Sequence, residues 1–384
     1  MSKSLLVLPS LLLLALPTLG CTGGRDRGPG PIDVDGGTVV PDGATSSGIA
    51  VLGNGAHTLE SVELVEIANS DQRLAAPRDV AFNPESPDQL WVVNHDTSSM
   101  TVIFDPGSET QTANTFAGFG NVHFMPHPSA LAFGAAGFLA TAQEEDGMTQ
   151  PSTPEDFMGP TLWPSDLELF DAGHASHLDM LHNSPDAVGI AWDHDNVYWV
   201  VDGYHRSLTR YDFGLDHGPG GEDHSDGDVA RFVEGEIGYV PGISSHVEVD
   251  HATGLVYVAD TGNARIAVLD PSTGTRGDDI GPNYDGGAQY AMVGATLTTL
   301  ADSSTIEMTH PSALALRDGM LFVSDADTSR VIAIGLDGTM IDWVDLSGAM
   351  APGSLSGIDF DASGRMLIAD GVGSRVLRVA PLAP

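Results

Sequence analysis

Cysteine and basic residues are both scarce in this chain of 384 residues. Cys21 is the single cysteine, so the chain cannot form an internal disulfide and its fold depends on burial alone. The 15 lysine and arginine residues stand against 53 aspartate and glutamate residues, which gives a formal net charge of −38 at pH 7. A surface this acidic repels phosphate backbones and anionic lipid. We therefore expect no nucleic-acid partner and no direct adsorption to a membrane surface.

The motifs of several common chemistries are also missing. The sequence contains no glycine-rich phosphate loop, no Gly-x-Ser-x-Gly turn, no His-Glu-x-x-His zinc motif and no Cys-x-x-Cys-His haem motif. Many of the carboxylates lie in turn segments, where aspartate is favoured for its local hydrogen bonds. Most of the acidic residues are therefore explained without a metal ion.

Only one long hydrophobic run is present, and it lies at the N-terminus. It extends from Leu5 to Leu16, which is too short to span a bilayer and has the form of an export signal. We therefore predict that residues 1–20 are a signal peptide. Residues 21–48 are rich in glycine, proline and aspartate, which predicts a flexible tether, and residues 49–384 are expected to form the folded domain.

The residues at the end of the predicted signal resemble a bacterial lipobox. The segment Leu19-Gly20-Cys21 carries this resemblance, which implies that Cys21 is lipidated and becomes the first residue of the mature protein. The protein would then lie in the bacterial cell envelope outside the cytoplasm, at the outer membrane if the organism has one. It would contact the membrane through the lipid anchor only. A plain secretory signal cut nearby and an uncleaved anchor stay open as alternatives.

A repeated pattern of apolar runs dominates the rest of the chain. One run ends in aspartate, a four-residue loop follows, and an arginine opens the next run. The clearest copies hold the pairs Asp260 and Arg265, Asp325 and Arg330, and Asp370 and Arg375. Weaker copies occupy Trp91–Asp105 and Tyr198–Asp212. We interpret each pair as a structural clamp between two strands, because the ends of twisted strands leave polar groups to satisfy.

Each copy follows a segment in which apolar residues alternate with small or polar ones. These segments are Ala76–Phe82, His127–Phe133, Ser184–Trp192, Ile243–Val249, His310–Leu316 and Leu355–Phe360. Such alternation is typical of β-strands, and a repeat of this length indicates a propeller or a solenoid. With a fourth, less regular strand in each unit, the sequence predicts an all-β fold, a six-bladed β-propeller with four-stranded antiparallel blades.

The last repeat ends at Val379 after only three strands. The alternating segment Ser61–Ala68 precedes the first unit. We therefore expect this N-terminal segment to supply the outer strand of the last blade and to close the ring, which also removes an open sheet edge.

The repeat resembles the NHL family of six-bladed propellers. The best match is Gly254–Asp270, which includes Asn263 before Arg265. Blade one departs from the pattern with Asn94 and Met100, and blade two with Gln143. The resemblance implies the fold, whereas propellers of this kind include both binding scaffolds and enzymes.

Five histidines map to one rim of the expected propeller, because the first strand of a blade starts, and the second ends, on the same side. They are His95, His127, His205, His246 and His310. Imidazole is a common ligand of transition metals, so these residues are candidate ligands of a divalent metal ion. For His127 and His310, a structural role before proline is the alternative.

His246 and Glu248 form a narrower candidate site. Because they are two residues apart on an expected inner strand, their side chains share a face. Burying them is costly unless they are paired, hydrated or bound to metal. The alternative is a water-filled channel in which the two side chains share a hydrogen bond. If a metal is bound, Glu248 or Tyr204 would assist proton transfer.

One enzyme of this propeller group is the peptidyl-hydroxyglycine amidating lyase, which holds zinc through three histidines at the starts of inner strands. The chain is similar in placing His127, His246 and His310 near those positions. The resemblance implies a metal-dependent lyase as one function to consider.

Two loops complete the candidates. Carboxylates that alternate with glycine are candidate oxygen ligands of Ca²⁺ in one loop, with a solvated acidic hairpin as the alternative. These residues are Asp216, Asp223, Asp226 and Asp228. The second loop, Glu144–Pro164, interrupts blade two and would be a lid over the axis, a partner-binding loop or a disordered segment.

Taken together, the sequence predicts a membrane-anchored, extracytoplasmic propeller that binds a small ligand or an envelope protein. The alternative is a lyase or hydrolase that depends on a zinc-like metal ion in a histidine-rich site on the axis. A structural role in the envelope is a third reading of the same features.

Overall fold

The computed structural model describes residues 48–118, 123–146 and 157–383. The predicted signal peptide, Cys21 and the predicted tether up to residue 47 lie outside the described residues, so these stay predictions. Within the described part of the chain, no helix is long and apolar enough to cross a membrane.

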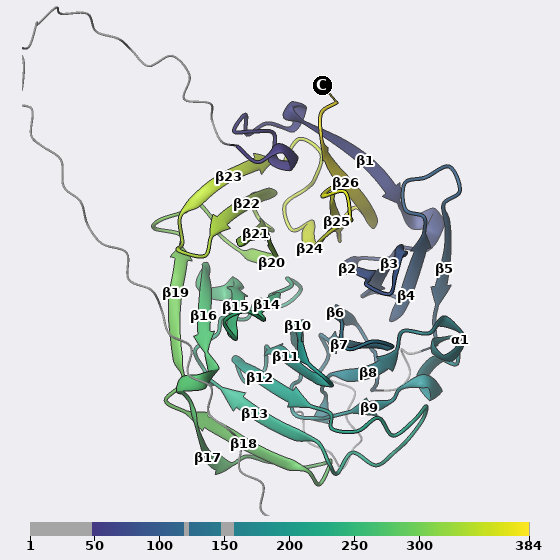
Figure 1. Ribbon diagram of the computed structural model, residues 1–384, viewed down its shortest axis with the longest axis vertical. Coiled ribbons are helices and arrows are strands. Elements are labelled where there is room, and N and C mark those ends of the chain that lie inside the picture. The colour runs from purple at the N-terminus through teal and green to yellow at the C-terminus, as the bar shows by residue number, and fades with distance from the viewer. Residues whose placement is uncertain (1–47, 119–122, 147–156, 384) are drawn as a thin grey trace, which may run out of the picture. The chain divides into compact units, whose positions relative to one another are not determined.

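The described chain forms six sheets arranged as blades around a central axis, as Figure 1 shows. Blade one contains β2 (Pro77–Asn83), β3 (Ser86–Asn94), β4 (Ser99–Phe104) and β5 (Thr112–Phe116). Blade two contains β6 (Pro128–Phe133), β7 (Phe138–Gln143), β8 (Thr161–Pro164) and β9 (Asp179–Met180). Blade three contains β10 (Ala187–His194), β11 (Val197–Asp202), β12 (Ser207–Asp212) and β13 (Asp228–Phe232).

The second half of the ring repeats this order. Blade four contains β14 (Val247–Asp250), β15 (Leu255–Asp260), β16 (Arg265–Asp270) and β19 (Thr296–Asp302). Blade five contains β20 (Pro311–Arg317), β21 (Met320–Asp325), β22 (Arg330–Gly335) and β23 (Met340–Asp345). Blade six contains β24 (Leu355–Phe360), β25 (Met366–Asp370), β26 (Arg375–Pro381) and β1 (Val62–Ala68). The predicted all-β, six-bladed propeller is confirmed.

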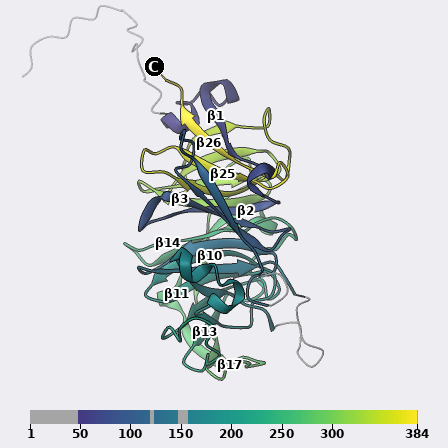
Figure 2. The same cartoon turned by 90° about the vertical axis from the view of Figure 1, so that its right-hand side faces the viewer.

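Helical segments are short and lie in the connections. They are η1 (Ala50–Leu52), η2 (Leu59–Ser61), η3 (Ser70–Gln72), α1 (Leu167–Phe170), η5 (Gly173–Ser176), η6 (Thr261–Asn263) and η7 (Pro271–Thr273). Figure 2 shows the blades edge-on, with the β-strands supplying nearly all of the regular structure.

Ring closure follows the expectation. β1 pairs antiparallel with β26, in a register that joins Val62 to Pro381 and Val65 to Arg378. The N-terminal strand is therefore the outer strand of the last blade, and the two ends of the domain lie side by side (Figure 1).

An extra hairpin was not predicted. β17 (Thr275–Asp279) and β18 (Ala288–Val293) are inserted between the third and fourth strands of blade four. β18 pairs in parallel with β13 of blade three, which turns that blade into a six-stranded sheet. The hairpin is mostly polar and exposed, so it lacks the apolar alternation by which a strand is recognised. It covers the outer edge of β13.

The core lies between neighbouring blades. Strands in the middle of a blade are buried on both faces, because each blade packs against the blade before it and the blade after it. Their sequences therefore read as continuous apolar runs, as in Val197–Val201 and Leu255–Ala259.

The aspartate–arginine pairs differ from blade to blade. Arg265 Nε lies 2.6 Å from Asp260 Oδ2, and Arg375 Nε lies 2.7 Å from Asp370 Oδ2. Asp260 is fully buried and also accepts a hydrogen bond from the backbone of Gly238, so it anchors the preceding connection.

The pairing predicted in blade five is wrong at the level of the side chains. Asp325 and Arg330 are backbone partners, but Arg330 Nη1 lies 2.8 Å from Glu307 and its guanidinium stacks 4.6 Å from the ring of Trp343. Asp325 instead accepts backbone hydrogen bonds, among them one from Thr328.

Candidate functional site

The rim histidines do not form the predicted metal site. Four of them lie beside separate carboxylates. The Nδ1 distances are 2.9 Å from His95 to Asp96, 2.7 Å from His127 to Glu145, 2.8 Å from His205 to Asp202 and 2.8 Å from His310 to Asp327. Only His95 and His127 come together, with stacked rings whose centroids are 4.9 Å apart. His205 follows the second strand of blade three, and His310 precedes the first strand of blade five, so these two histidines lie in other parts of the ring.

His246 lies apart from these four, in a cavity on the axis. The five histidines, which were expected on one rim, therefore do not share one site. Tyr204 and Glu248, the two alternatives for assisting proton transfer, lie in different places. Tyr204 is exposed on the rim against the ring of His205, whereas Glu248 lines the axial cavity.

The structure describes the first three residues of the predicted lid, Glu144–Asp146, and Glu144 contacts the connection before blade four. Glu144 Oε1 accepts hydrogen bonds from the hydroxyl of Tyr239, at 2.9 Å, and from the backbone of Gly242, at 2.6 Å. Residues 147–156 lie outside the described residues, so a lid stays a prediction. The end of the segment is not a loop, because Thr161–Pro164 forms the third strand of blade two.

The axial cavity has a volume of about 350 Å³ and is lined by the inner strands of the blades. Blade one contributes Asp79, blade four contributes His246 and Glu248, and blade six contributes Asp359. Alternation along each strand turns these side chains inward while their neighbours pack between the blades. Four aromatic side chains also line the cavity, together with His251 and Arg317. The aromatic residues are Phe82, Phe133, Trp192 and Phe360.

Each carboxyl group in the cavity joins its own blade to the next one. Asp79 Oδ2 accepts a hydrogen bond from Leu131 N of blade two at 3.0 Å. Asp359 Oδ2 accepts one from Phe82 N of blade one at 2.7 Å. Glu248 accepts a backbone hydrogen bond from Leu316 of blade five. These contacts satisfy amide groups that the inner strands would otherwise leave unpaired.

Burial changes the protonation of the whole cavity. It raises the pKa of Asp79 to about 8, and it raises the pKa of Glu248 to about 8 with help from the charges of Asp359 and Asp79. Burial also raises the pKa of Asp359 to about 6. The pKa of His246 falls to about 4 for the same reason. Near neutral pH the cavity therefore presents the neutral imidazole of His246 and the protonated carboxyl groups of Asp79 and Glu248, which can both donate and accept hydrogen bonds, beside Asp359, which is mostly ionised.

His246 has unused hydrogen-bonding capacity. Its Nδ1 lies 3.7 Å from Asp79 Oδ1, and its buried Nε2 has no hydrogen-bond partner among the described residues. Asp79 was missed by the sequence reasoning, although it occupies the same strand position in blade one as His246 does in blade four. Gly357 occupies that position in blade six, where a Cβ atom would lie 2.5 Å from the Cα atom of Asp79.

A second cavity of about 340 Å³ lies at the starts of the same inner strands, on the rim side. Arg78, Ser244 and Ser356 are among its lining residues. The axis is therefore hollowed at two levels. Asp79, His246, Glu248 and Asp359 line one level, whereas Arg78 and Asp96 line the level on the rim side.

The predicted calcium loop does not bring its four carboxylates together. Asp216 accepts a hydrogen bond from Gly218 N, and Asp223 accepts two from Ser225. Asp228 begins β13 and is hydrogen-bonded to Tyr290. The prediction is therefore wrong as a set of ligands, because these side chains satisfy turns and strand contacts of their own.

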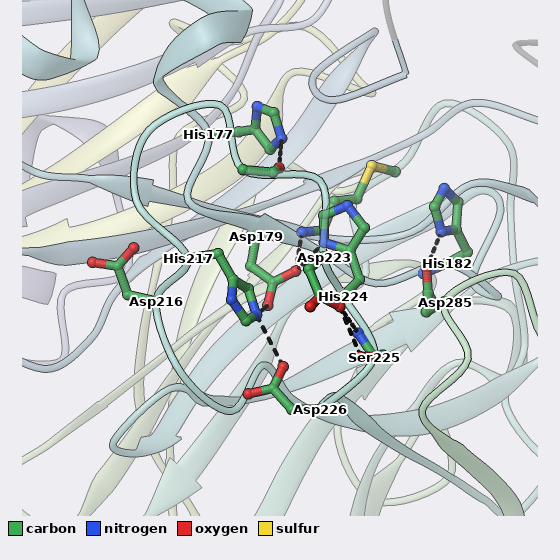
Figure 3. Close-up of polar contacts among 12 residues, drawn as sticks. His177, Asp179, His182, Asp216, His217, Asp223, His224, Ser225, Asp226 and Asp285 are labelled. Carbon is green, nitrogen blue, oxygen red and sulfur yellow. Dashed lines mark hydrogen bonds and ion pairs between the residues drawn. The ribbon is translucent and has the colours of Figure 1, made fainter.

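Asp226, the fourth of these carboxylates, belongs to a different cluster (Figure 3). The loop between β12 and β13 lies against the outer strand of blade two, where His224 Nδ1 is 2.5 Å from Asp179 Oδ1. His217 Nε2 lies 2.9 Å from Asp226 Oδ1 and 3.8 Å from Asp179 Oδ2. Burial raises the pKa of Asp179, and the hydrogen bond that His224 donates to Asp179 raises the pKa of His224. Asp179 was missed because it lies in a different blade from the loop.

Comparison with solved structures agrees with the architecture. The chain is a six-bladed β-propeller. It is similar to an auxiliary nutrient binding protein from Bacteroides ovatus, at 13% identity and a TM-score of 0.53, over 84% of this chain and 77% of that chain. It is also similar to an auxiliary nutrient binding protein from Bacteroides thetaiotaomicron, at 10% identity and a TM-score of 0.52, over 79% of this chain and 68% of that chain. A luciferin-regenerating enzyme is similar at 13% identity and a TM-score of 0.52, over 84% of this chain and 96% of that chain.

At these identities the likeness concerns the fold alone. No protein-family model matches the sequence, and no curated protein matches it. Function therefore has to be argued from the cavity and from the clusters of side chains.

Proposed function

We propose that this protein is an extracytoplasmic binding propeller that takes a small polar ligand into its axial cavity. The observation that carries the proposal is the cavity of about 350 Å³ lined by Asp79, His246, Glu248 and Asp359. A concave site with a few converging polar groups on a largely preformed frame is the usual form of a small-molecule site.

The lining favours a ligand that bears hydroxyl or amine groups. Glu248 and Asp359 are half-buried at the cavity wall, and His246 Nε2 has no partner within the described chain. Aromatic rings at Phe82, Phe133 and Phe360 add flat apolar surface beside these polar groups. Rings can stack on the apolar face of a ligand, while carboxyl and imidazole groups bond to its polar edge.

Two further observations support a binding role in the cell envelope. The N-terminal export signal and the lipobox-like segment ending in Cys21 favour an anchored protein outside the cytoplasm. Two of the similar structures are of auxiliary nutrient binding proteins, which supports a binding role for a propeller of this fold.

The binding proposal is tested by thermal denaturation of the purified full chain with defined probes. The probes are a neutral monosaccharide series and a primary-amine series, each at millimolar concentration. A ligand of the cavity raises the midpoint temperature, because it binds the folded state only. Glu248→Gln should remove or reduce that rise, whereas Glu236→Gln, a change at an exposed glutamate, should leave it unchanged. Equal rises in both variants would place the ligand elsewhere.

The anchoring proposal has a separate test. A Cys21→Ser variant should lose incorporation of a labelled fatty acid and should leave the membrane fraction, whereas the parent chain should incorporate the label. Retention of the variant in the membrane fraction would favour an uncleaved anchor.

The alternative of a metal-dependent lyase or hydrolase on the axis is not carried forward. The histidines that were to hold its metal lie beside separate carboxylates, and His246 stands alone among them in the cavity. An enzyme of that kind needs at least three ligands around one ion, and among the described residues only Asp179, His217 and Asp226, which do not line the cavity, have ligand atoms close enough together.

A further inference from the structure

The cluster at the margin between blades two and three has the geometry of a metal site. Ligand atoms of Asp179, His217 and Asp226 all lie within 4.8 Å of one another, and this is the single such group of three among the described residues. We propose that these three side chains bind one divalent transition-metal ion, which ties the β12–β13 loop to the outer strand of blade two. This site is separate from the axial cavity and does not depend on the proposed function.

The strongest observation is the orphaned oxygen of Asp179. Asp179 is fully buried, and its Oδ2 atom accepts no hydrogen bond from any described residue. A buried carboxylate oxygen without a donor is costly, and a cation is the partner that removes the cost. Oδ2 faces His217 Nε2 at 3.8 Å, so the unsatisfied atom points into the cluster (Figure 3).

The two carboxylate ligands are also held in place by second contacts. Asp179 Oδ1 is occupied by Met180 N at 2.6 Å and by His224 Nδ1 at 2.5 Å, which leaves Oδ2 for the ion. Asp226 Oδ2 accepts a hydrogen bond from Leu215 N at 2.9 Å, which turns Oδ1 toward His217. Outer contacts of this kind orient the ligands of protein metal sites and raise their affinity.

The spacing suits a small ion. With bonds of about 2.0–2.1 Å in a tetrahedral arrangement, ligand atoms lie about 3.3 Å apart. The two distances from His217 Nε2, 2.9 Å and 3.8 Å, lie on either side of that value. Small shifts of the loop side chains would therefore bring the three atoms around one ion.

The ligand set defines the class of metal. One imidazole with two carboxylates suits a first-row divalent ion such as Zn²⁺. Ca²⁺ instead takes about six to eight ligands, which are oxygen atoms rather than imidazole nitrogens. Asp226 is the most exposed of the three, so water can complete the coordination on that side. Without the ion, the hydrogen bond between His217 and Asp226 accounts for the loop position but leaves Asp179 Oδ2 unpaired.

The test uses the full chain purified in detergent by anion exchange without an affinity tag. After treatment with a chelator, the protein is incubated with Zn²⁺ in the presence of excess Ca²⁺ and Mg²⁺, passed through a desalting column and analysed for metals by mass spectrometry. We expect about one zinc ion per chain, as the three-ligand site allows. The same protein loaded with Co²⁺ should show visible absorption of a site with nitrogen and oxygen ligands.

The variants decide where the ion lies. His217→Ala and Asp226→Asn should each weaken zinc binding by about tenfold or more. Two matched controls should bind zinc like the parent chain. His194→Ala removes an exposed histidine that also faces an aspartate, and His127→Ala removes one member of the stacked pair on the rim. Circular dichroism of each variant establishes that it is folded.

Four outcomes would overturn the proposal. The first three are failure of the parent chain to retain zinc, retention in His217→Ala and Asp226→Asn that equals retention in the parent chain, and displacement of zinc by calcium. Loss of zinc in His127→Ala alone would assign the ion to the rim and would equally overturn it. None of these results bears on ligand binding in the axial cavity.

Discussion

The axial cavity and the blade margin hold similar side chains in opposite situations. At the axis, Asp79, Glu248 and Asp359 each accept a backbone hydrogen bond from the next blade. At the margin, Asp179 has one oxygen held by neighbours and the other unpaired.

This difference teaches how to separate structural carboxylates from candidate ligands. At the axis the carboxyl groups are part of the closure of the ring, and the unsatisfied atom belongs to an imidazole, His246 Nε2. At the margin the unsatisfied atom is a carboxyl oxygen of a buried aspartate, and a second imidazole faces it. An imidazole nitrogen without a partner favours a polar organic ligand, whereas a carboxyl oxygen without a donor favours a cation.

The largest effect is expected from Asp79→Ala. This change removes the acceptor for the buried amide groups of Leu131 and Val80, so the free energy of unfolding should fall by about 2–3 kcal/mol. Asp79→Asn keeps one acceptor oxygen and should cost less. Urea denaturation of both variants measures the difference. Equal losses would mean that the hydrogen bonds between blades contribute little, and the contrast with the margin would weaken.

The next effect is a change in pH dependence at Glu248. Its pKa of about 8 in the folded chain lies above the ordinary value of 4.5. The folded state therefore binds more protons, and its stability falls as pH rises from about 4.5 to 8. Glutamine stays neutral, so Glu248→Gln should be about 1–2 kcal/mol more stable relative to the parent at pH 8 than at pH 5. Thermal melting of the variant and the parent chain between these pH values measures the difference in stability. A difference that stays the same from pH 5 to pH 8 would contradict the raised pKa.

At the margin, His224→Ala should have a smaller effect on the metal-free protein. It removes the hydrogen bond to Asp179 Oδ1, while Met180 N still bonds to that oxygen, so we expect a loss of about 1 kcal/mol. The same change should weaken zinc binding by roughly tenfold, because His224 orients the carboxylate. Urea denaturation in the presence of a chelator measures the loss of stability, and zinc titration measures the loss of zinc affinity. A loss of stability without any change in zinc binding would limit His224 to a structural role.

The smallest effect is expected from His217→Ala without metal. His217 and Asp226 form a partly exposed contact in a surface loop, and such contacts contribute about 0–1 kcal/mol. The variant should therefore melt close to the parent in chelator, but it should fail to gain the stabilisation that zinc gives the parent. A large loss in chelator would show that the loop is held without an ion.

The repeats were readable because their chemistry is local. The run Leu255–Asp260 and its continuation after Arg265 show strand, turn and strand in consecutive residues. Closure by Ser61–Ala68 was also readable, because three strands at the C-terminus and one unassigned strand at the N-terminus leave a single way to complete the blade. The hairpin β17–β18 was not readable, because its strands are polar and pair with a different blade.

The candidate sites were predicted less well. His246 and Glu248 were expected to share a face and do line one cavity. The expected grouping of His246 with the rim histidines failed, because position along the axis depends on how far each side chain lies from the start of its strand. Asp226 was named as a ligand, but its partner Asp179 comes from another blade and has no signal in the sequence of the loop.

The sequence by itself determined the number of blades, the strands within them and the closure of the ring. These follow from apolar periodicity and turn residues, which act over a few neighbouring positions. Only the tertiary structure decided which ionisable groups meet, as at Asp79 with His246 and at Asp179 with His217. The physical reason is that these groups come from different blades, and their distances depend on how the blades pack against one another around the axis.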